Sequence, residues 1–292
     1  MPTIRHLVLS GGGPVMVQTL AAIQELESSG FMKREDIESI YGVSAGCIVG
    51  VLFSLGFDWT TINDYIIKRP WQDVFKVRVQ DILDSYTKRG IFDLKTIEKC
   101  FKPLLDAKDI PLDIHLKDFY ALTKIDLHFF AFDVNRYELE DISHMTYPDL
   151  PLLEAIQMTC AIPVLMTPAI LGEKCFMDGG VACNYPLRYC LERPGIKEDE
   201  VLGFKNQYSN AERKGTIDAS STLLDYLLNF LFKAIFSLNR NNVQPTIENE
   251  VVCDASYLSL DLFRSTLSDI EVRRSLFQQG KKEAQAFLQN RV

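Results

Sequence analysis

The segment that most constrains this chain is SIYGVSAGCIVG, residues 39–50. Its first residues favour a β-strand, the pattern G-x-S-x-G follows from Gly42 to Gly46, and an apolar run typical of a buried helix comes next. A strand that enters a helix through so sharp a turn lifts the Ser44 hydroxyl clear of the sheet. The free N–H groups and the positive dipole end of the helix favour negative charge there. We therefore predict that Ser44 is a nucleophile whose turn is supported by Gly42 and Gly46, although a plain glycine-rich turn fits the same five residues.

A second glycine turn lies upstream of this segment. Residues 4–10 favour a strand and are followed at once by Gly11, Gly12 and Gly13, after which Pro14 opens a helix that runs to about Ser28. Together with the strand that enters the Ser44 turn, these elements form a βαβ unit with two parallel strands. Both turns are then expected at the carboxyl ends of neighbouring strands, where α/β sheets place their sites.

Two explanations compete for the glycine run. A phosphate-binding loop needs G-x-G-x-x-G or a Walker pattern that ends in Gly-Lys-Ser/Thr, and the sequence has neither. An oxyanion hole needs backbone N–H groups close to the nucleophile, and glycines let the backbone approach that closely. We therefore favour an oxyanion hole formed by Gly11, Gly12 and Gly13.

The base that activates Ser44 is predicted from the order of residues along the chain. The last of the four histidines is His144, so the α/β-hydrolase order of serine, acid and then histidine cannot be completed. Asp178 follows a strand-like stretch and precedes Gly179 and Gly180, which predicts a tight turn that presents its carboxylate. A direct Ser44–Asp178 pair is the simplest arrangement, and apolar neighbours would raise the pKa of Asp178 above its ordinary value of about 3.9. The alternative is a triad that uses one of three histidines in an unusual place: His115, His128 or His144.

These motifs resemble those of the patatin-like phospholipase family over residues 4–205, about two-thirds of the chain. The matching segments are Gly11-Gly12-Gly13, Gly42-Val43-Ser44-Ala45-Gly46, Ala161-Ile162-Pro163, and Asp178-Gly179-Gly180 followed by Asn184-Tyr185-Pro186. The resemblance implies an α/β fold related to the α/β-hydrolases: a mainly parallel sheet flanked by helices, with the nucleophile elbow after an early strand. It also implies a phospholipase A-type acyl hydrolase with a Ser-Asp dyad, calcium-independent and without a cofactor. Ser44 would be the nucleophile, Asp178 the base and then the acid toward the leaving group, and N–H groups around Gly12 and Gly13 would hold the oxyanion.

The chain departs from this family at Pro14-Val15-Met16. The family usually has a variable residue, then Arg or Lys, then Gly at these positions. The missing basic residue removes a charge that could meet a phosphate, and Pro14 removes a potential N–H donor. Two alternatives stay open on these residues: a non-lipid esterase or thioesterase, and a lipid-binding pseudoenzyme.

Composition limits the partners and the compartment. A formal net charge of −8 argues against a nucleic-acid partner, which needs a concentrated basic face. Seven cysteines without C-x-x-C spacing indicate reduced thiols and predict no metal site. The first residues do not have the pattern of a secretory signal, and no uncharged apolar run is long enough for a transmembrane helix. We expect a cytoplasmic protein that contacts membranes peripherally and acts on a phospholipid or another acyl-ester lipid.

The rest of the chain is predicted as one domain, residues 1–292, with a catalytic core at about 4–205 and a helical C-terminal part at about 206–292. Helices are expected at 60–68, 79–86, 93–105, 151–160 and 269–290, with breaks at Pro70, Gly90 and Pro103; strands are expected at 125–134, 138–144, 174–177, 200–205 and around Val251. The strands at 125–134 and 138–144 should pair in antiparallel fashion. Trp59 and Trp71 are interpreted as packing anchors rather than as the lining of a channel.

Residues 223–238, LLDYLLNFLFKAIFSL, predict a helix with two alternative roles. Polar residues recur only at every fourth position, so most of its circumference is apolar. Such a helix is either buried on several sides or meets a membrane, and it is short for a membrane span. Our hypothesis is that it covers or borders the Ser44 cleft and inserts Leu and Phe side chains into a lipid surface; a core helix is the alternative.

Overall fold

The central sheet of the computed structural model is mostly parallel. The structure describes residues 3–208, 217–241, 244–256 and 258–291. Within them the strand order is β10-β9-β1-β2-β4-β8-β7, and β5 pairs with β4. The strands are β1 (His6–Leu9), β2 (Ser39–Val43), β4 (Asp126–Asp133), β5 (Glu138–Ile142), β7 (Ala169–Leu171), β8 (Lys174–Asp178), β9 (Val201–Gln207) and β10 (Glu250–Asp254). Neighbours from β10 to β4 are parallel, whereas β5, β7 and β8 pair in antiparallel fashion. Two short strands, β3 (Gly90–Phe92) and β6 (Val164–Met166), form a separate pair.

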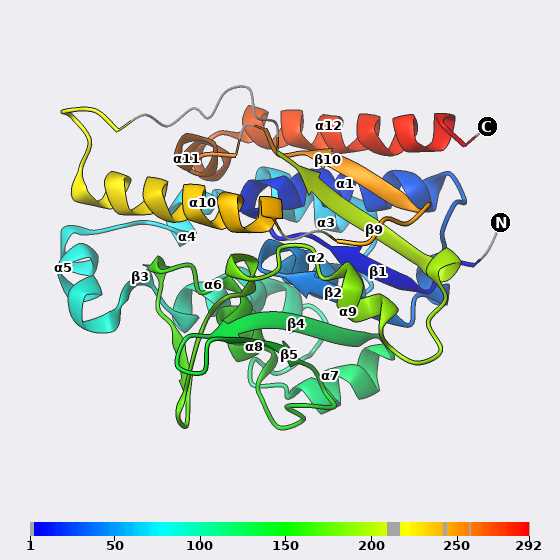
Figure 1. The fold of residues 1–292 in the computed structure, drawn as a ribbon, viewed down its shortest axis with the longest axis horizontal. Coiled ribbons are helices and arrows are strands. Elements are labelled where there is room, and N and C mark those ends of the chain that lie inside the picture. The colour runs from blue at the N-terminus through cyan, green and yellow to red at the C-terminus, as the bar shows by residue number, and fades with distance from the viewer. Residues whose placement is uncertain (1–2, 209–216, 242–243, 257, 292) are drawn as a thin grey trace.

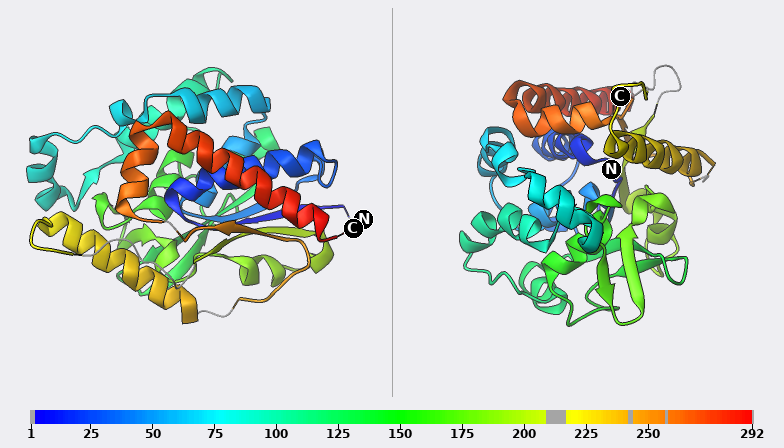
Figure 2. Two further views of the ribbon diagram at one scale, coloured as in Figure 1. Left: turned by 90° about the horizontal axis from the view of Figure 1, so that it is seen from above. Right: turned by 90° about the vertical axis from the view of Figure 1, so that its left-hand side faces the viewer.

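Helices cover this sheet and extend beyond its edge (Figure 1). They are α1 (Met16–Ser28), α2 (Ala45–Ser54), α3 (Trp59–Lys68), α4 (Trp71–Val74), α5 (Val79–Lys88), α6 (Leu94–Asp106), α7 (Leu116–Thr123), α8 (Leu152–Cys160), α9 (Leu187–Leu191), α10 (Leu223–Asn241), α11 (Leu260–Ser268) and α12 (Ile270–Gln289). The last helix, α12, lies along α1, as Figures 1 and 2 show from different sides. The C-terminal part is therefore joined to the core by α12 and by β10. That residues 1–292 form one domain stays a prediction.

Strand β1 shows why the sheet needs cover on both faces. Leu7 and Leu9 point into the large core that also contains α1, α2 and α8, and Val8 points into a smaller core on the other face, beside α9. Strands of a parallel sheet are apolar on both sides for this reason. The predicted fold class, a mainly parallel sheet flanked by helices, is confirmed.

The strand register brings the predicted turns to one edge of the sheet. Leu9 of β1 lies beside Gly42 of β2, so the glycine run and the Ser44 turn leave adjacent strands at the same level. On the other side, Val43 lies beside Phe130 of β4, and the next residue of β4 lies opposite Asp178 at the end of β8. The pairing of β4 with β5 is antiparallel, as predicted.

The fold differs from the prediction at α6 and in elements that the prediction lacks, among them α7, α9 and α11. The predicted break at Pro103 is wrong, because α6 continues through this proline to Asp106. Proline cannot donate to the carbonyl of Lys99 four residues earlier, and the Arg69 guanidinium donates to that carbonyl instead, at 2.8 Å. Helix α11 is absent from the prediction, although its N-cap, Ser259, accepts a hydrogen bond from the Leu262 N–H in the usual way.

Candidate active site

Ser44 sits on a strained turn between β2 and α2. Its backbone has φ 53° and ψ −124°, an unfavourable conformation for a residue with a Cβ. The Ser44 N–H donates to the Thr159 hydroxyl at 2.8 Å, and that hydroxyl donates to the Phe130 carbonyl at 2.6 Å. Thr159 therefore connects the strained turn to the neighbouring strand β4. Sequence reasoning misses this threonine because nothing in its own helix, α8, marks it as a partner of the turn.

Close backbone contacts explain the small residues around the two turns. A Cβ at Gly46 would lie 2.5 Å from the Leu9 carbonyl oxygen, and a Cβ at Gly179 would lie 2.3 Å from the Phe130 carbonyl oxygen. Neither backbone atom can move far within the sheet, so any side chain would push the turns away from it. Gly42 and Gly180 are similarly confined, because a Cβ at Gly42 would lie 2.9 Å from the Cys47 nitrogen and one at Gly180 would lie 2.8 Å from the Asn184 Oδ1.

Asp178 is a buried carboxylate next to Ser44. Only 4% of it is exposed, and its Oδ1 accepts a hydrogen bond from the Gly180 N–H at 2.7 Å. Burial raises the pKa of Asp178 to about 6, and hydrogen bonds from Ser44 and the Gly180 N–H oppose that rise. Asp178 can therefore accept a proton near neutral pH and release it again, as a general base must.

The glycine loop is held by two amide side chains. The Gly11 carbonyl accepts hydrogen bonds from the Nδ2 atoms of Asn184 and Asn206, each at 2.7 Å. Because a trans peptide points its C=O and the following N–H in opposite directions, these two bonds also fix the direction of the Gly12 N–H. Sequence reasoning misses Asn206, at the end of β9, because its position beside β1 depends on the strand order.

The N–H groups of the three glycines differ in their contacts within the protein. The Gly11 N–H donates to the Asn184 carbonyl at 3.1 Å, so it is occupied within the protein. For Gly12 and Gly13, the described part of the chain contains no acceptor bonded to the N–H. Gly13 has φ +50°, which glycine adopts without strain. The loop therefore leaves the N–H groups of Gly12 and Gly13 available to donate to a bound group.

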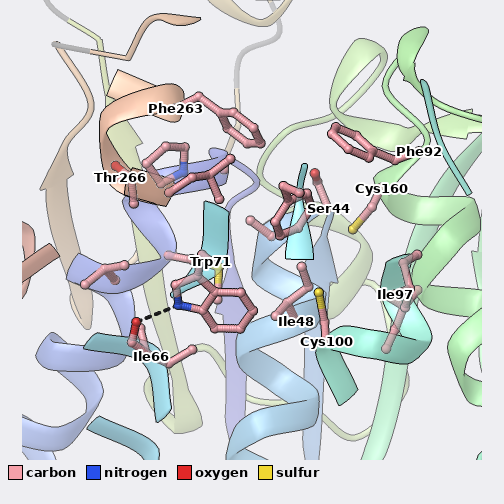
Figure 3. Close-up of a pocket in the computed structure, with 18 of the residues that line it drawn as sticks. Ser44, Ile48, Ile66, Trp71, Phe92, Ile97, Cys100, Cys160, Phe263 and Thr266 are labelled. Atoms are coloured by element: carbon pink, nitrogen blue, oxygen red, sulfur yellow. Dashed lines mark hydrogen bonds between the residues drawn. The ribbon is translucent and has the colours of Figure 1, made fainter. Parts of the chain in front are cut away.

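A cavity of about 200 Å³ opens beside Ser44 (Figure 3). Its walls come from α2, α3, α4, α6, α8 and α11 and are almost entirely hydrocarbon. The interpretation of Trp71 as a simple packing anchor is incomplete, because its ring lines this cavity while its Nε1 donates to the Ile66 carbonyl at 2.8 Å. Pro14 and Met16 also line it with apolar surface, whereas Val15, between them, is buried outside it. Such a cavity suits an apolar chain.

Ser44 also lines a second, smaller chamber of about 60 Å³. It contains the glycine loop, Asp178 and Tyr208, and the Tyr208 hydroxyl accepts a hydrogen bond from Asn184 at 2.9 Å. Helix α10 contributes Phe232 and Ile235 to its wall. The Ser44 hydroxyl thus lies where a hydrocarbon cavity and a more polar chamber meet.

The candidate triad histidines lie elsewhere and line neither cavity. His128 is buried between two carboxylates, with its Nε2 3.2 Å from Asp126 and its Nδ1 2.9 Å from Asp141. Burial opposes its charge, yet the two carboxylates hold the pKa of His128 above its ordinary value. His144 also contacts Asp126, at 2.9 Å, and His115 lies near Asp118 on the surface, at 3.7 Å.

The cysteines and the other candidate metal ligands are also expected to form no site. All seven cysteines are free thiols. Over the described ranges, no three His, Cys, Asp or Glu side chains gather as metal ligands would, and no helix combines the length and the apolar character needed to cross a membrane.

Comparisons with known proteins identify a family model and related sequences. A family model described as patatin-like phospholipase matches residues 7–191. The chain is 26% identical over 211 residues to "Probable lipid hydrolase 463L" of Invertebrate iridescent virus 6, covering 70% of this chain and 71% of that protein. It is 19% identical over 283 residues to "Uncharacterized protein R571" of Acanthamoeba polyphaga mimivirus, covering 96% and 92%.

Among solved structures, VipD from Legionella pneumophila has the same fold. The two structures superpose with a TM-score of 0.58 and 18% sequence identity, over 99% of this chain and 67% of VipD. The family match covers more than half of the chain and includes Ser44 and Asp178. This chain belongs to the patatin-like phospholipase family.

Proposed function

We propose that the protein is a lipid acyl hydrolase of the phospholipase A type that uses a Ser44–Asp178 dyad. The location of the pair supports this proposal most strongly. Ser44 lines both a hydrocarbon cavity of about 200 Å³ and a smaller chamber, and the smaller chamber is also lined by Asp178 and the glycine loop. The acyl chain of an ester would occupy the hydrocarbon cavity, and the ester group and its alcohol part would face the smaller chamber. The substrate class is a phospholipid or a related acyl ester.

The chemistry follows from the contacts around the pair. Asp178 takes the proton from the Ser44 hydroxyl while the Ser44 Oγ attacks the ester carbonyl carbon. The N–H groups of Gly12 and Gly13 stabilise the negative charge on the carbonyl oxygen. Asp178 then gives its proton to the leaving alcohol oxygen, which leaves an acyl ester on Ser44. Asp178 next accepts a proton from water as the water oxygen attacks that ester. It then returns this proton to the departing Ser44 Oγ, which releases the fatty acid and restores the Ser44 hydroxyl.

The direct test compares lipid and soluble substrates. We expect hydrolysis of phospholipid vesicles, unchanged in excess chelator and absent from the Ser44→Ala variant. Hydrolysis restricted to short soluble esters or thioesters would instead indicate a non-lipid esterase. Lipid binding without turnover by the parent protein would indicate a pseudoenzyme, and loss of rate in chelator that calcium restores would contradict metal independence.

The pH dependence of the rate is a further prediction. Below the raised pKa of Asp178, about 6, its carboxyl group is protonated and cannot accept the Ser44 proton. We expect kcat/KM to fall by about tenfold per pH unit below that value and to level off above it. A pH–rate profile on a soluble ester measures this directly. An acid limb near the ordinary aspartate pKa of about 3.9 would contradict the role of burial.

Helix α10 connects the site to the surface. Its Leu228 is buried and its Phe232 lines the chamber beside Ser44, whereas Leu223 and Phe230 are 73% and 67% exposed. The helix therefore borders the cleft on one side and presents apolar side chains to solvent on the other. We propose that the exposed side enters the lipid surface, as amphipathic interfacial helices do.

Phe230 and Phe232 form a matched pair for testing this role. Phe230→Ser removes only an exposed ring and should weaken vesicle binding by about tenfold, with little change on a short soluble ester. Phe232→Ser alters the chamber wall and should lower the rate on both substrates. Vesicle co-sedimentation and initial rates separate the two effects. Equal losses on both substrates from Phe230→Ser would contradict a membrane role for the exposed side.

A further inference from the structure

Helix α5 exposes nearly all of its apolar side chains. The exposed fractions are 77% for Val79, 50% for Ile82, 66% for Leu83 and 91% for Tyr86. These residues are three or four positions apart, so they lie on one side of the helix. A helix that packs on a core buries such a side. A contiguous apolar surface left in solvent marks a contact site for a partner or a membrane.

The segments that lead into and out of α5 form part of the wall of the large cavity. Phe75 precedes the helix and Phe92 follows it in β3, and both rings line the cavity beside Ser44. The two rings contact each other edge to face, with centroids 5.3 Å apart; Figure 3 shows Phe92 beside Ser44. Helix α5 therefore projects from the rim of the proposed acyl site, and whatever binds its apolar side lies next to that site.

The charges around α5 are opposite in sign to those of the whole chain. Residues 76–89 contain four cations and two carboxylates: Lys76, Arg78, Lys88, Arg89, Asp81 and Asp84. The two carboxylates pair with Arg78 at 2.9 Å and with Lys88 at 3.5 Å. Lys76 precedes the helix and Arg89 follows its last residue, and both side chains are exposed. Within the described ranges, no acid pairs with either of them. A local positive charge in a chain of net charge −8 favours an anionic partner.

Helix α10 continues this surface. Figure 1 and the left view of Figure 2 both place α5 and the beginning of α10 at the same end of the molecule. The first turns of α10 add further exposed apolar side chains there, among them Leu223, Tyr226 and Phe230. The two helices thus present apolar side chains at one end of the molecule. The segments that flank α5 line the large cavity, and α10 lines the smaller chamber.

We propose that α5 inserts its apolar side into a membrane that contains anionic phospholipid, with Lys76 and Arg89 on the headgroups. This inference rests on the proposed lipid substrate and specifies how the protein reaches it. An apolar side flanked by free cations is the pattern of helices that lie in an anionic membrane interface. The location of α5 at the cavity rim would place the lipid ester next to Ser44.

The test measures vesicle binding without turnover. Full-length protein that carries Ser44→Ala is sedimented with vesicles of phosphatidylcholine, alone or mixed with phosphatidylserine. Leu83→Ser should weaken binding to the mixed vesicles by about tenfold. Leu122→Ser on α7 is the matched control, because Leu122 is 58% exposed and Figure 1 shows α7 away from the end of the molecule where α5 lies. It should leave binding unchanged.

Charge is tested with a second pair of variants. Arg89→Gln should weaken binding to the anionic vesicles by about fivefold and leave binding to phosphatidylcholine unchanged. Lys124→Gln is its control, since both residues end a helix in the left-handed conformation. Equal binding by Leu83→Ser and its parent would overturn the inference, as would a dimer in solution that Leu83→Ser dissociates. Failure of hydrolysis with vesicle binding intact would contradict the proposed function alone.

Discussion

Ser44→Ala and Asp178→Asn are each expected to lower kcat by about 10⁴-fold or more, and the double variant should be no slower than either single one. The reason is that the nucleophile and its base act as one unit, so removal of either leaves only binding and the oxyanion donors. Initial rates on a soluble ester, with thermal melting of each variant, measure both the loss and the integrity of the fold. Asp178→Asn should melt at the same temperature as the parent or higher at pH 7. A carboxylate whose pKa is raised by burial destabilises the folded state as pH rises above its unfolded value of about 3.9.

His144→Asn is the control for this prediction. His144 contacts Asp126 and stacks on Tyr120, with ring centroids 3.8 Å apart, and it lines neither cavity. Its loss should leave the rate of the folded protein nearly unchanged. A loss as large as that of Asp178→Asn, in a protein that still melts like the parent, would mean that a histidine supplies the base.

Asn206→Asp should lower kcat by about 10²-fold while KM changes little. The substitution replaces the amide that donates to the Gly11 carbonyl with a carboxylate, whose oxygens repel that carbonyl. The peptide then turns, and the Gly12 N–H no longer points at the developing oxyanion. Asn206 acts through this peptide, so it is a positioning residue.

Asn249→Asp provides a matched control, because Asn249 is also buried and its amide also donates to a backbone carbonyl, that of Asp199, at 2.9 Å. It lies outside both cavities and should cost stability without a specific loss of kcat. The decisive readout is the affinity for a trifluoromethyl ketone, which forms a tetrahedral adduct with a serine nucleophile. That affinity should fall in parallel with kcat/KM for Asn206→Asp but not for Asn249→Asp. An unchanged kcat in Asn206→Asp would contradict the positioning role.

The sequence is sufficient where the signal is local. The strand, the sharp turn and the helix around Ser44 lie within a dozen consecutive residues, and the turn after β8 is set by Asp178 and the two glycines that follow it. Long periodic segments such as α10 and α12 are predictable for the same reason, since their pattern repeats over several turns. The antiparallel pairing of β4 with β5 is also predictable, because the two strands are consecutive in the chain and a short polar turn joins them.

What depends on distant contacts cannot be predicted in this way. Asn206 reaches Gly11 only because β9 lies beside β1, and the strand order is not visible in either strand alone. The sequence presents Trp71 as a packing anchor because one aromatic residue on a short helix gives no sign of the cavity that other helices complete around it. The path of α6 through Pro103 likewise depends on Arg69, from another helix end.

The Pro14-Val15-Met16 departure has a structural meaning. Val15 is buried, and Pro14 and Met16 line the large cavity. Pro14 and Met16 therefore extend the hydrocarbon wall beside Ser44, while Val15, at the position where the family usually has a cation, packs into the core. We expect the departure to affect headgroup preference and rate more than the class of reaction.

A fluorophosphonate probe reports directly whether Ser44 is a nucleophile activated by Asp178. Such a probe phosphonylates an activated serine hydroxyl, and peptide mass spectrometry then identifies the modified residue. We expect one label on Ser44 in the parent protein, none in Ser44→Ala, and a labelling rate that falls strongly in Asp178→Asn. Labelling of a different serine, or an unlabelled Ser44 in a folded parent protein that hydrolyses ester, would contradict this role of Ser44.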